Sequence, residues 1–188
     1  SLPFLMIGSL FLLIANLPIK SLNTLVAECG LADICSQVYS STFSLMALFT
    51  VVGITYSYLK NDKISTAVNG ALTGLAAFVL LTPSSKVLEN GEAVTGVISK
   101  DWTAGQGMIC AILIGFLVGY IYSLCIRKDI RVKMPEGVPP GVADSFSSLL
   151  PTGIITIICA IIYAVCHFVF KTTFAELIYS AIQIPLQG

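Results

Sequence analysis

The sequence predicts an all-α membrane protein, a bundle of about five transmembrane helices with short amphipathic helices at the membrane surface. The charged residues make up 11% of the 188 residues and the hydrophobic ones 56%, whereas a soluble domain is about one quarter charged. The charges are also clustered, so that long runs carry none. Each run is long enough to cross a hydrocarbon core, which needs roughly 20 helical residues.

The expected spans, in order, cover residues 1–19, 36–59, 64–83, 103–126 and 151–170. The first lacks the basic start and small-residue cleavage site of a signal peptide and is followed by further spans, so we interpret it as a transmembrane helix. Apolar residues at helical spacing from Leu22 to Cys29 predict a short interfacial helix after it. After the fifth span, Thr173 and Glu176 have the spacing of a capping box. They open a surface helix or the start of a sixth span.

The second connector and the fourth connector carry most of the basic residues. Lys60 and Lys63 lie between the second and third spans, and the basic cluster of Arg127–Lys133 lies between the fourth and fifth. Because short cytoplasmic loops are rich in lysine and arginine, both connectors are expected in the cytoplasm, with the amino terminus. The formal net charge of zero argues against nucleic-acid binding, which depends on an excess of basic residues.

Two glycine pairs lie inside expected spans, Gly70 with Gly74 and Gly115 with Gly119. Such small-xxx-small motifs let helix backbones approach each other closely. We interpret them as helix-packing positions within one chain, which suggests contact between the third and fourth spans; the alternative is a dimerisation face. The six cysteines form no CxxC pair, so neither a disulfide nor a metal site is expected.

The connector between the last two spans, residues 127–150, is unusually specific for so apolar a chain. Pro139 and Pro140 fix an extended backbone there. Beyond them an apolar helical face begins at Val142 and includes Phe146, which predicts a short amphipathic helix lying on the protein or on the membrane surface. It leads into Pro151, which either kinks this helix or starts the fifth span.

The stretch MPEGVPPGVADSFSSLLP, residues 134–151, resembles the signature of the membrane (IIC) component of bacterial phosphotransferase-system sugar permeases of the lactose, cellobiose and diacetylchitobiose family. IGSLFLLIANLP, residues 7–18, and IQIPLQG, residues 182–188, resemble the same family in the same order. The connector residues that carry the pattern are Pro135, Val138, Pro139, Pro140, Ser145, Phe146 and Pro151.

The resemblance implies a homodimeric carrier of the bacterial cytoplasmic membrane with about ten spans per subunit. Its amino-terminal half would form the dimer scaffold, and its other half would bind the disaccharide, which a partner IIB protein phosphorylates on the cytoplasmic side. This chain, residues 1–188, matches the amino-terminal half. A non-transporting membrane scaffold or assembly protein is the alternative, and half of an ion-coupled transporter is a third possibility.

The chain offers several polar side chains within or beside its spans but no recognisable catalytic motif. No Walker loop, GxSxG or HExxH sequence occurs, so no catalytic residue, cofactor or metal ligand is expected. His167 is read as a locally bonded imidazole and Trp102 as an interfacial anchor, with sugar contact the alternative for each. Asn16, Asn69 and Gln106 either line a polar path or bond across helices.

Overall fold

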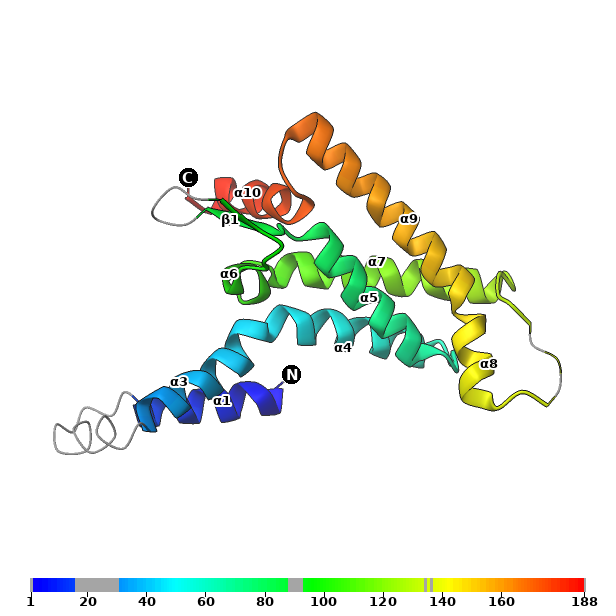
Figure 1. The fold of residues 1–188 in the computed structure, drawn as a ribbon, viewed down its shortest axis with the longest axis horizontal. Coiled ribbons are helices and arrows are strands. Elements are labelled where there is room, and N and C mark those ends of the chain that lie inside the picture. Colours follow the sequence, from blue (N-terminus) through cyan, green and yellow to red (C-terminus); the bar gives the residue numbers. More distant parts are fainter. Residues whose placement is uncertain (1, 16–30, 88–92, 134, 136, 188) are drawn as a thin grey trace.

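The computed structural model describes residues 2–15, 31–87, 93–133, 135 and 137–187, and it is built almost entirely of helices (Figure 1). This confirms the predicted helical membrane bundle. The α-helices are α1 (Leu2–Ala15), α3 (Leu31–Thr42), α4 (Met46–Asn61), α5 (Ala67–Leu81), α6 (Lys100–Thr103), α7 (Met108–Arg127), α8 (Pro140–Ser147), α9 (Leu149–Val165) and α10 (Phe174–Gln187).

Two short irregular helices extend the regular ones. The 3₁₀ turn η1 (Phe43–Leu45) joins α3 to α4, and the π-helical turn η2 (Cys166–Phe170) continues α9. The sequence did not predict the strands β1 (Ser85–Val87) and β2 (Ala93–Thr95), which pair antiparallel in the loop after α5.

Among the described residues, three helical segments are long and apolar enough to cross a membrane by length and composition. They are Asp33–Asn61, Met108–Arg127 and Pro140–Phe170. The helix α5 is apolar but shorter, at 15 residues. The division into five spans therefore stays a prediction. The interfacial helix expected from Leu22 to Cys29 lies outside the described residues.

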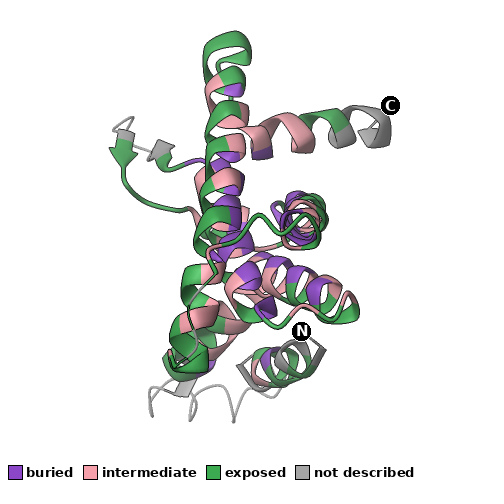
Figure 2. Ribbon diagram, turned by 90° about the vertical axis from the view of Figure 1, so that its right-hand side faces the viewer, coloured by how far each residue is buried: buried purple, intermediate pink, exposed green. Residues whose placement is uncertain are grey.

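The centre of the bundle is formed by α4, α5 and α7, with α9 packed across α5 and α7 (Figure 1). Val51 and Leu59 of α4, Phe78 of α5 and Val118 of α7 are among its buried side chains. Figure 2 shows buried residues where these helices face one another and exposed residues around them. Large apolar side chains stay exposed on the outer faces, Phe168 at 80% for example, as expected where lipid replaces water.

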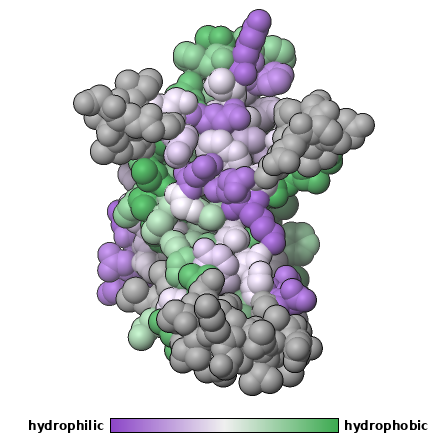
Figure 3. Space-filling view, turned by 90° about the vertical axis from the view of Figure 1, so that its left-hand side faces the viewer, coloured by the Kyte–Doolittle hydropathy of each residue, from purple (hydrophilic) through white to green (hydrophobic). Residues whose placement is uncertain are grey.

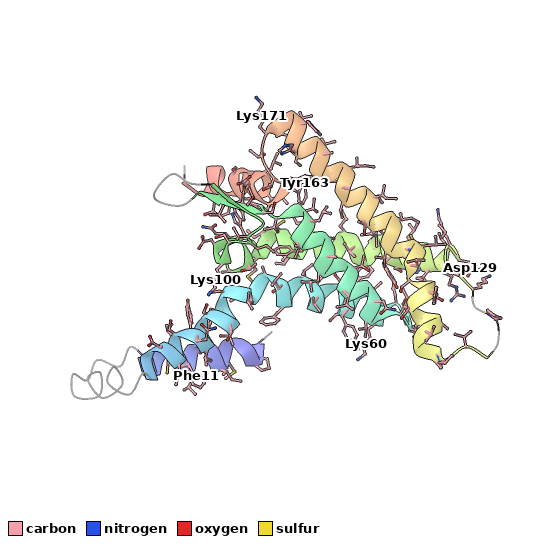
Figure 4. All side chains as sticks on the ribbon, viewed as in Figure 1. Phe11, Lys60, Lys100, Asp129, Tyr163 and Lys171 are labelled. Carbon is pink, nitrogen blue, oxygen red and sulfur yellow. The ribbon has the colours of Figure 1, made fainter. Side chains whose placement is uncertain are left out.

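The two basic connectors lie at one end of the bundle. An ion pair of 2.9 Å joins Arg127, at the end of α7, to Asp62, in the turn after α4. At the opposite end, Thr103 of α6 donates a hydrogen bond to the carbonyl of Ser44 in η1. In Figure 4, Lys60 and Asp129 both lie toward the right-hand part of the view, whereas Lys100 lies toward the left. This arrangement agrees with the expectation that the two connectors lie on the same side of the membrane. That this side is the cytoplasmic one stays a prediction.

The end that carries α6 and β1 is polar in its middle. Figure 3, a view onto this end, shows hydrophilic side chains gathered across the middle of the face and hydrophobic ones at its sides. A polar end with apolar flanks is the distribution that a helix bundle needs to meet water at its ends and lipid around its sides.

Candidate functional site at the connector joint

The helix α8 begins at the Pro-Pro pair of the connector. Pro140 occupies the first helical position, where the missing N–H has no intrahelical partner to lose and the fixed φ already suits a helix. The carbonyl of Pro139 accepts hydrogen bonds from the backbone N–H groups of Val142 and Ala143, at 3.0 and 3.1 Å. The pair therefore ends the extended connector and starts α8 at one defined residue.

The chain bends between α8 and α9 at Ser148. Pro151 is the third residue of α9 and is fully buried. It has no N–H to donate to the carbonyl of Ser147, so one helical hydrogen bond is missing at this bend. Two others are kept, from Ser148 N–H to the Asp144 carbonyl at 3.1 Å and from Thr152 N–H to the Ser148 carbonyl at 3.0 Å. Pro151 thus lies in the first turn of α9 and interrupts the passage from α8.

Polar groups on α5 hold this bend in place. The side-chain amide of Asn69 donates to the Asp144 carbonyl at 3.2 Å and to the Ser148 hydroxyl at 3.1 Å. One helical turn further, the hydroxyls of Thr73 and Thr152 lie 2.9 Å apart and share a hydrogen bond. We call these five residues the connector joint. It ties the end of the connector to a central helix of the bundle.

The apolar side of α8 faces away from the protein. Val142 and Phe146 are 46% and 44% exposed, and Leu149 and Leu150 at the bend are exposed as well, whereas Ser148 is buried against Asn69. A soluble amphipathic helix buries its apolar side. This reversed orientation fits the membrane-surface position that the sequence allowed.

Removing the Thr73–Thr152 hydrogen bond offers a quantitative test of the joint. We expect the double-mutant cycle of Thr73→Val and Thr152→Val to give a coupling free energy of about 0.6 kcal/mol, the average for such pairs between membrane helices. Thermal unfolding of the purified protein measures it. Thr156→Val is the matched control, because the hydroxyl of Thr156 bonds to the carbonyl of Thr152 on its own helix. Equal coupling of Thr73 to both positions would contradict the contact.

A second polar network closes the same end of the bundle between α4, α5 and α7. The carboxylate of Asp62 accepts hydrogen bonds from Arg127 and from the hydroxyl of Ser123. The hydroxyl of Tyr122 donates to that of Thr66 at 2.9 Å. Among the described residues, every polar side chain that is buried has a hydrogen-bond partner within the protein. The polar groups of this network therefore stabilise the packing of α7 against the turns that follow α4 and precede α5.

The start of the connector carries its own ion pairs. Arg131 lies 2.8 Å from the carboxylate of Asp129, and Lys133 contacts the other oxygen. These two cations hold the pKa of the exposed Asp129 carboxyl below its usual range. Of the connector residues that carry the sequence pattern, Pro135 and Val138 precede α8, and Ser145 bonds to the carbonyl of Gly141 within it.

The first glycine pair lies against α4. A Cβ added to Gly70 would overlap the side chain of Leu59, and one added to Gly74 would lie 2.6 Å from the hydroxyl oxygen of Thr55. The backbones of α4 and α5 approach closely at both positions. Gly70 of α5 also lies beside the ring of Tyr122 of α7. The two residues bring α5 into contact with α7.

The second glycine pair, on α7, lies against a neighbouring face of the same helix, α4. An added Cβ would lie 3.1 Å from Ile54 at Gly115 and 3.0 Å from Tyr58 at Gly119. The hydroxyl of Thr55 also donates to the carbonyl of Gly115 at 3.2 Å. Both glycine pairs are therefore used within the chain, against α4, and the predicted contact between the third and fourth spans is present as the packing of α5 on α7.

The other polar candidates lie apart from one another. His167 is exposed in η2, and its ring stacks on that of Tyr163 with centroids 5.8 Å apart. Trp102 in α6 meets the ring of Tyr179 in α10 edge-on at 5.8 Å. Gln106 is exposed in the turn before α7, and Asn16 lies outside the described residues. Asn69 is the one that bonds across helices within the described part of the chain.

The cysteines and the capping box were the remaining sequence features. Five cysteines are free and buried, namely Cys35, Cys110, Cys125, Cys159 and Cys166; Cys29 lies outside the described residues. No group of three or more potential metal ligands occurs among the residues that the structure describes. Of the capping box, the Glu176 half is formed, since its carboxylate accepts hydrogen bonds from the N–H and the hydroxyl of Thr173, both at 2.9 Å.

Comparison with known proteins gives consistent matches over nearly the whole chain. The family model "Phosphotransferase system, EIIC" matches residues 1–186. The oligo-beta-mannoside-specific EIIC component of Bacillus subtilis is 36% identical over 99% of this chain and 42% of its own length. The lactose-specific EIICB component of Lacticaseibacillus casei is 29% identical over 81% of this chain and 26% of its own length.

A solved structure has the same fold. It is that of ChbC, the IIC component of the N,N'-diacetylchitobiose-specific phosphotransferase system, which matches with a TM-score of 0.89 at 30% identity. The match covers 98% of this chain and 44% of that one. The chain therefore spans less than half the length of each of these relatives.

Proposed function

The chain belongs to the phosphotransferase system EIIC family of integral membrane proteins, and from this premise we propose that it forms part of a permease that imports a β-linked disaccharide coupled to its phosphorylation. The observation that carries the proposal is the match of nearly the whole chain to EIIC components for oligo-β-mannosides and lactose and to the diacetylchitobiose transporter. Family membership favours this over a non-transporting scaffold or assembly protein.

Within such a permease, this part acts as the scaffold. Two observations support a scaffold role. Asn69, Thr73 and Asp62 bond to other helices of the same chain, and the two glycine pairs pack against α4. Groups already satisfied within the bundle hold helices in place and leave sugar recognition to residues beyond this chain. The permease works as a homodimer, with this half in the interface between the subunits.

The phosphoryl group comes from another protein domain. EIIC components act with a IIB component, which is fused to the membrane part in EIICB proteins such as the lactose relative. We place IIB at the end of the bundle with the basic connectors, in the cytoplasm together with the amino terminus. The positive connectors support this orientation. The connector joint would then hold α8 at the face where IIB arrives.

The proposal is tested by uptake of labelled cellobiose or diacetylchitobiose into cells that produce the intact permease containing this chain. We expect the sugar to appear inside as its phosphate ester, and deletion of IIB to abolish its accumulation. The readout is the ratio of phosphorylated to free sugar in the cell extract. Accumulation of unmodified disaccharide without IIB would contradict coupled transport and would favour an ion-driven carrier.

A further inference from the structure

A groove runs along the outside of the bundle between α4 and α7, two helices that lie side by side (Figure 1). Its volume is about 510 Å³. Phe49, Gly53 and Ile54 of α4 and Phe116 of α7 give it a mostly apolar lining. The α4 side chains Thr50, Ser57 and Asn61 add polar groups to it. The helix α5 packs on a different face of α4, the one that carries Thr55. The groove is therefore open to the surroundings of the bundle.

Gly53 gives the groove its depth. A Cβ at this position would have no atom within 4 Å, so the missing side chain leaves space at the surface and serves no close helix packing. This distinguishes Gly53 from Gly70, Gly74, Gly115 and Gly119, each of which has a neighbour closer than 4 Å. A side chain introduced here would enter the groove itself.

A second pocket lies next to the groove, at the end of the bundle that carries the basic connectors. Tyr58 lines both spaces. The second pocket measures about 290 Å³ and is also lined by Tyr120, Arg127 and Lys128. The lining therefore changes from mostly apolar residues in the groove to two tyrosines and two cations in the second pocket.

The charge at this mouth is positive. Among the described residues, Asp62 is the only carboxylate that lines the pocket, and both of its oxygens already interact, one with Arg127 and one with the hydroxyl of Ser123. Arg127 is 68% exposed and directs one N–H toward Asp62, which leaves further donors of its guanidinium for an anion. Lys128 is exposed beside it and adds a charge that Asp62 does not neutralise.

We propose that this composite groove, formed by the apolar groove and its cationic mouth, binds one anionic phospholipid. The headgroup phosphate lies between Arg127 and Lys128, the tyrosines lie at the level of the ester groups, and one acyl chain follows Gly53 toward Phe49. Tyrosine at the interface and basic residues at helix ends are positioned for this in membrane proteins. A phospholipid matches both the apolar groove and its cationic mouth. A helix packed in the groove would match only the apolar part.

The test uses the intact permease, purified in mild detergent and titrated in native mass spectrometry with phosphatidylglycerol or with phosphatidylcholine of the same acyl chains. We expect one phosphatidylglycerol to be retained per chain, with about tenfold preference over phosphatidylcholine. Lys128→Gln should reduce this preference at least threefold, and Arg127→Gln with Lys128→Gln should remove it. The control pair Arg131→Gln with Lys133→Gln changes two charges of the connector outside the groove and should leave the preference within twofold.

A second variant tests the acyl-chain part without changing charge. Gly53→Leu fills the apolar groove and should weaken retention of both lipids at least fivefold. Its control, Gly153→Leu, adds the same side chain at another exposed glycine with no neighbour within 4 Å. Both variants should unfold close to the wild-type temperature, because a Cβ at either position has no atom within 4 Å.

Four results would overturn the proposal. Equal retention of the two lipids by the wild type would show that Arg127 and Lys128 do not select the headgroup. Unchanged lipid binding by Gly53→Leu would show that the acyl chain does not lie in the groove. Competition by glycerol phosphate at equal concentration would reduce the site to a free-phosphate site. Cross-linking of two subunits through Ser57→Cys, which lies in the groove, would show that a second copy occupies it.

Discussion

Gly107→Ala is expected to destabilise the protein by about 3 kcal/mol, the upper part of the range for overpacked positions. Gly107 is buried in the turn between α6 and α7, and a Cβ there would overlap the carbonyl oxygen of Trp102 and lie 3.3 Å from the ring of Phe78. The overlap is with backbone, so rotation of a side chain cannot relieve it. Thermal or denaturant unfolding of the purified protein in detergent measures the loss.

Gly105→Ala is the matched control for this substitution. Gly105 lies two residues earlier in the same turn, is exposed, and would carry a Cβ with no atom within 4 Å. Its stability should change by no more than about 0.5 kcal/mol, as for most surface substitutions. If both variants unfolded alike, the backbone of this turn would be free to move and α6 would not be fixed against α7.

The charge-free runs of the sequence predicted the helices because apolar segments of this length have few other stable forms in a membrane. The limits were less predictable. The second span was expected to begin at residue 36, whereas α3 begins at Leu31, carries Asp33 and other polar residues, and joins α4 through η1. The β1–β2 hairpin was missed because strands of three residues in a polar loop leave no alternating pattern.

The partners of the polar residues were harder to predict than the helices. Asn69 and Thr73 are four residues apart, a spacing that places both on one face of a helix, and this signal could have indicated a polar seam on α5. Their partners Ser148 and Thr152 have the same spacing but lie 79 residues further along the chain. Periodicity gives the face of each helix, whereas only the packing of the bundle decides which two faces meet.

The reversed orientation of α8 has a similar explanation. The sequence placed Val142 and Phe146 on one face and Asp144 with Ser148 elsewhere, which the structure reproduces. Which face turns toward the protein depends on the solvent outside, because an apolar face exposed to lipid costs little. The bend at Ser148 and the hydrogen bonds of Asn69 then fix the polar face inward.

Asn69→Leu is expected to lower sugar uptake by the intact permease by up to about tenfold while leaving its amount in the membrane unchanged. Leucine removes both hydrogen bonds that hold the bend between α8 and α9. Bonds between membrane helices contribute about 0.6 kcal/mol each, so the loss of both, about 1.2 kcal/mol, lowers the equilibrium constant for docking of α8 by nearly tenfold. Initial rates of disaccharide uptake, normalised to protein level, measure the effect.

The remaining bonds explain why folding should survive this change. The Ser148 hydroxyl keeps its bond to the carbonyl of Ser145, and the Asp144 carbonyl keeps the Ser148 N–H, so no buried polar group is left without a partner at the bend. Gln106→Leu removes an exposed amide from the other end of the bundle and should leave uptake within twofold. Wild-type uptake by Asn69→Leu would mean that the position of α8 does not limit transport, and the connector would then serve only as a tether between two helices.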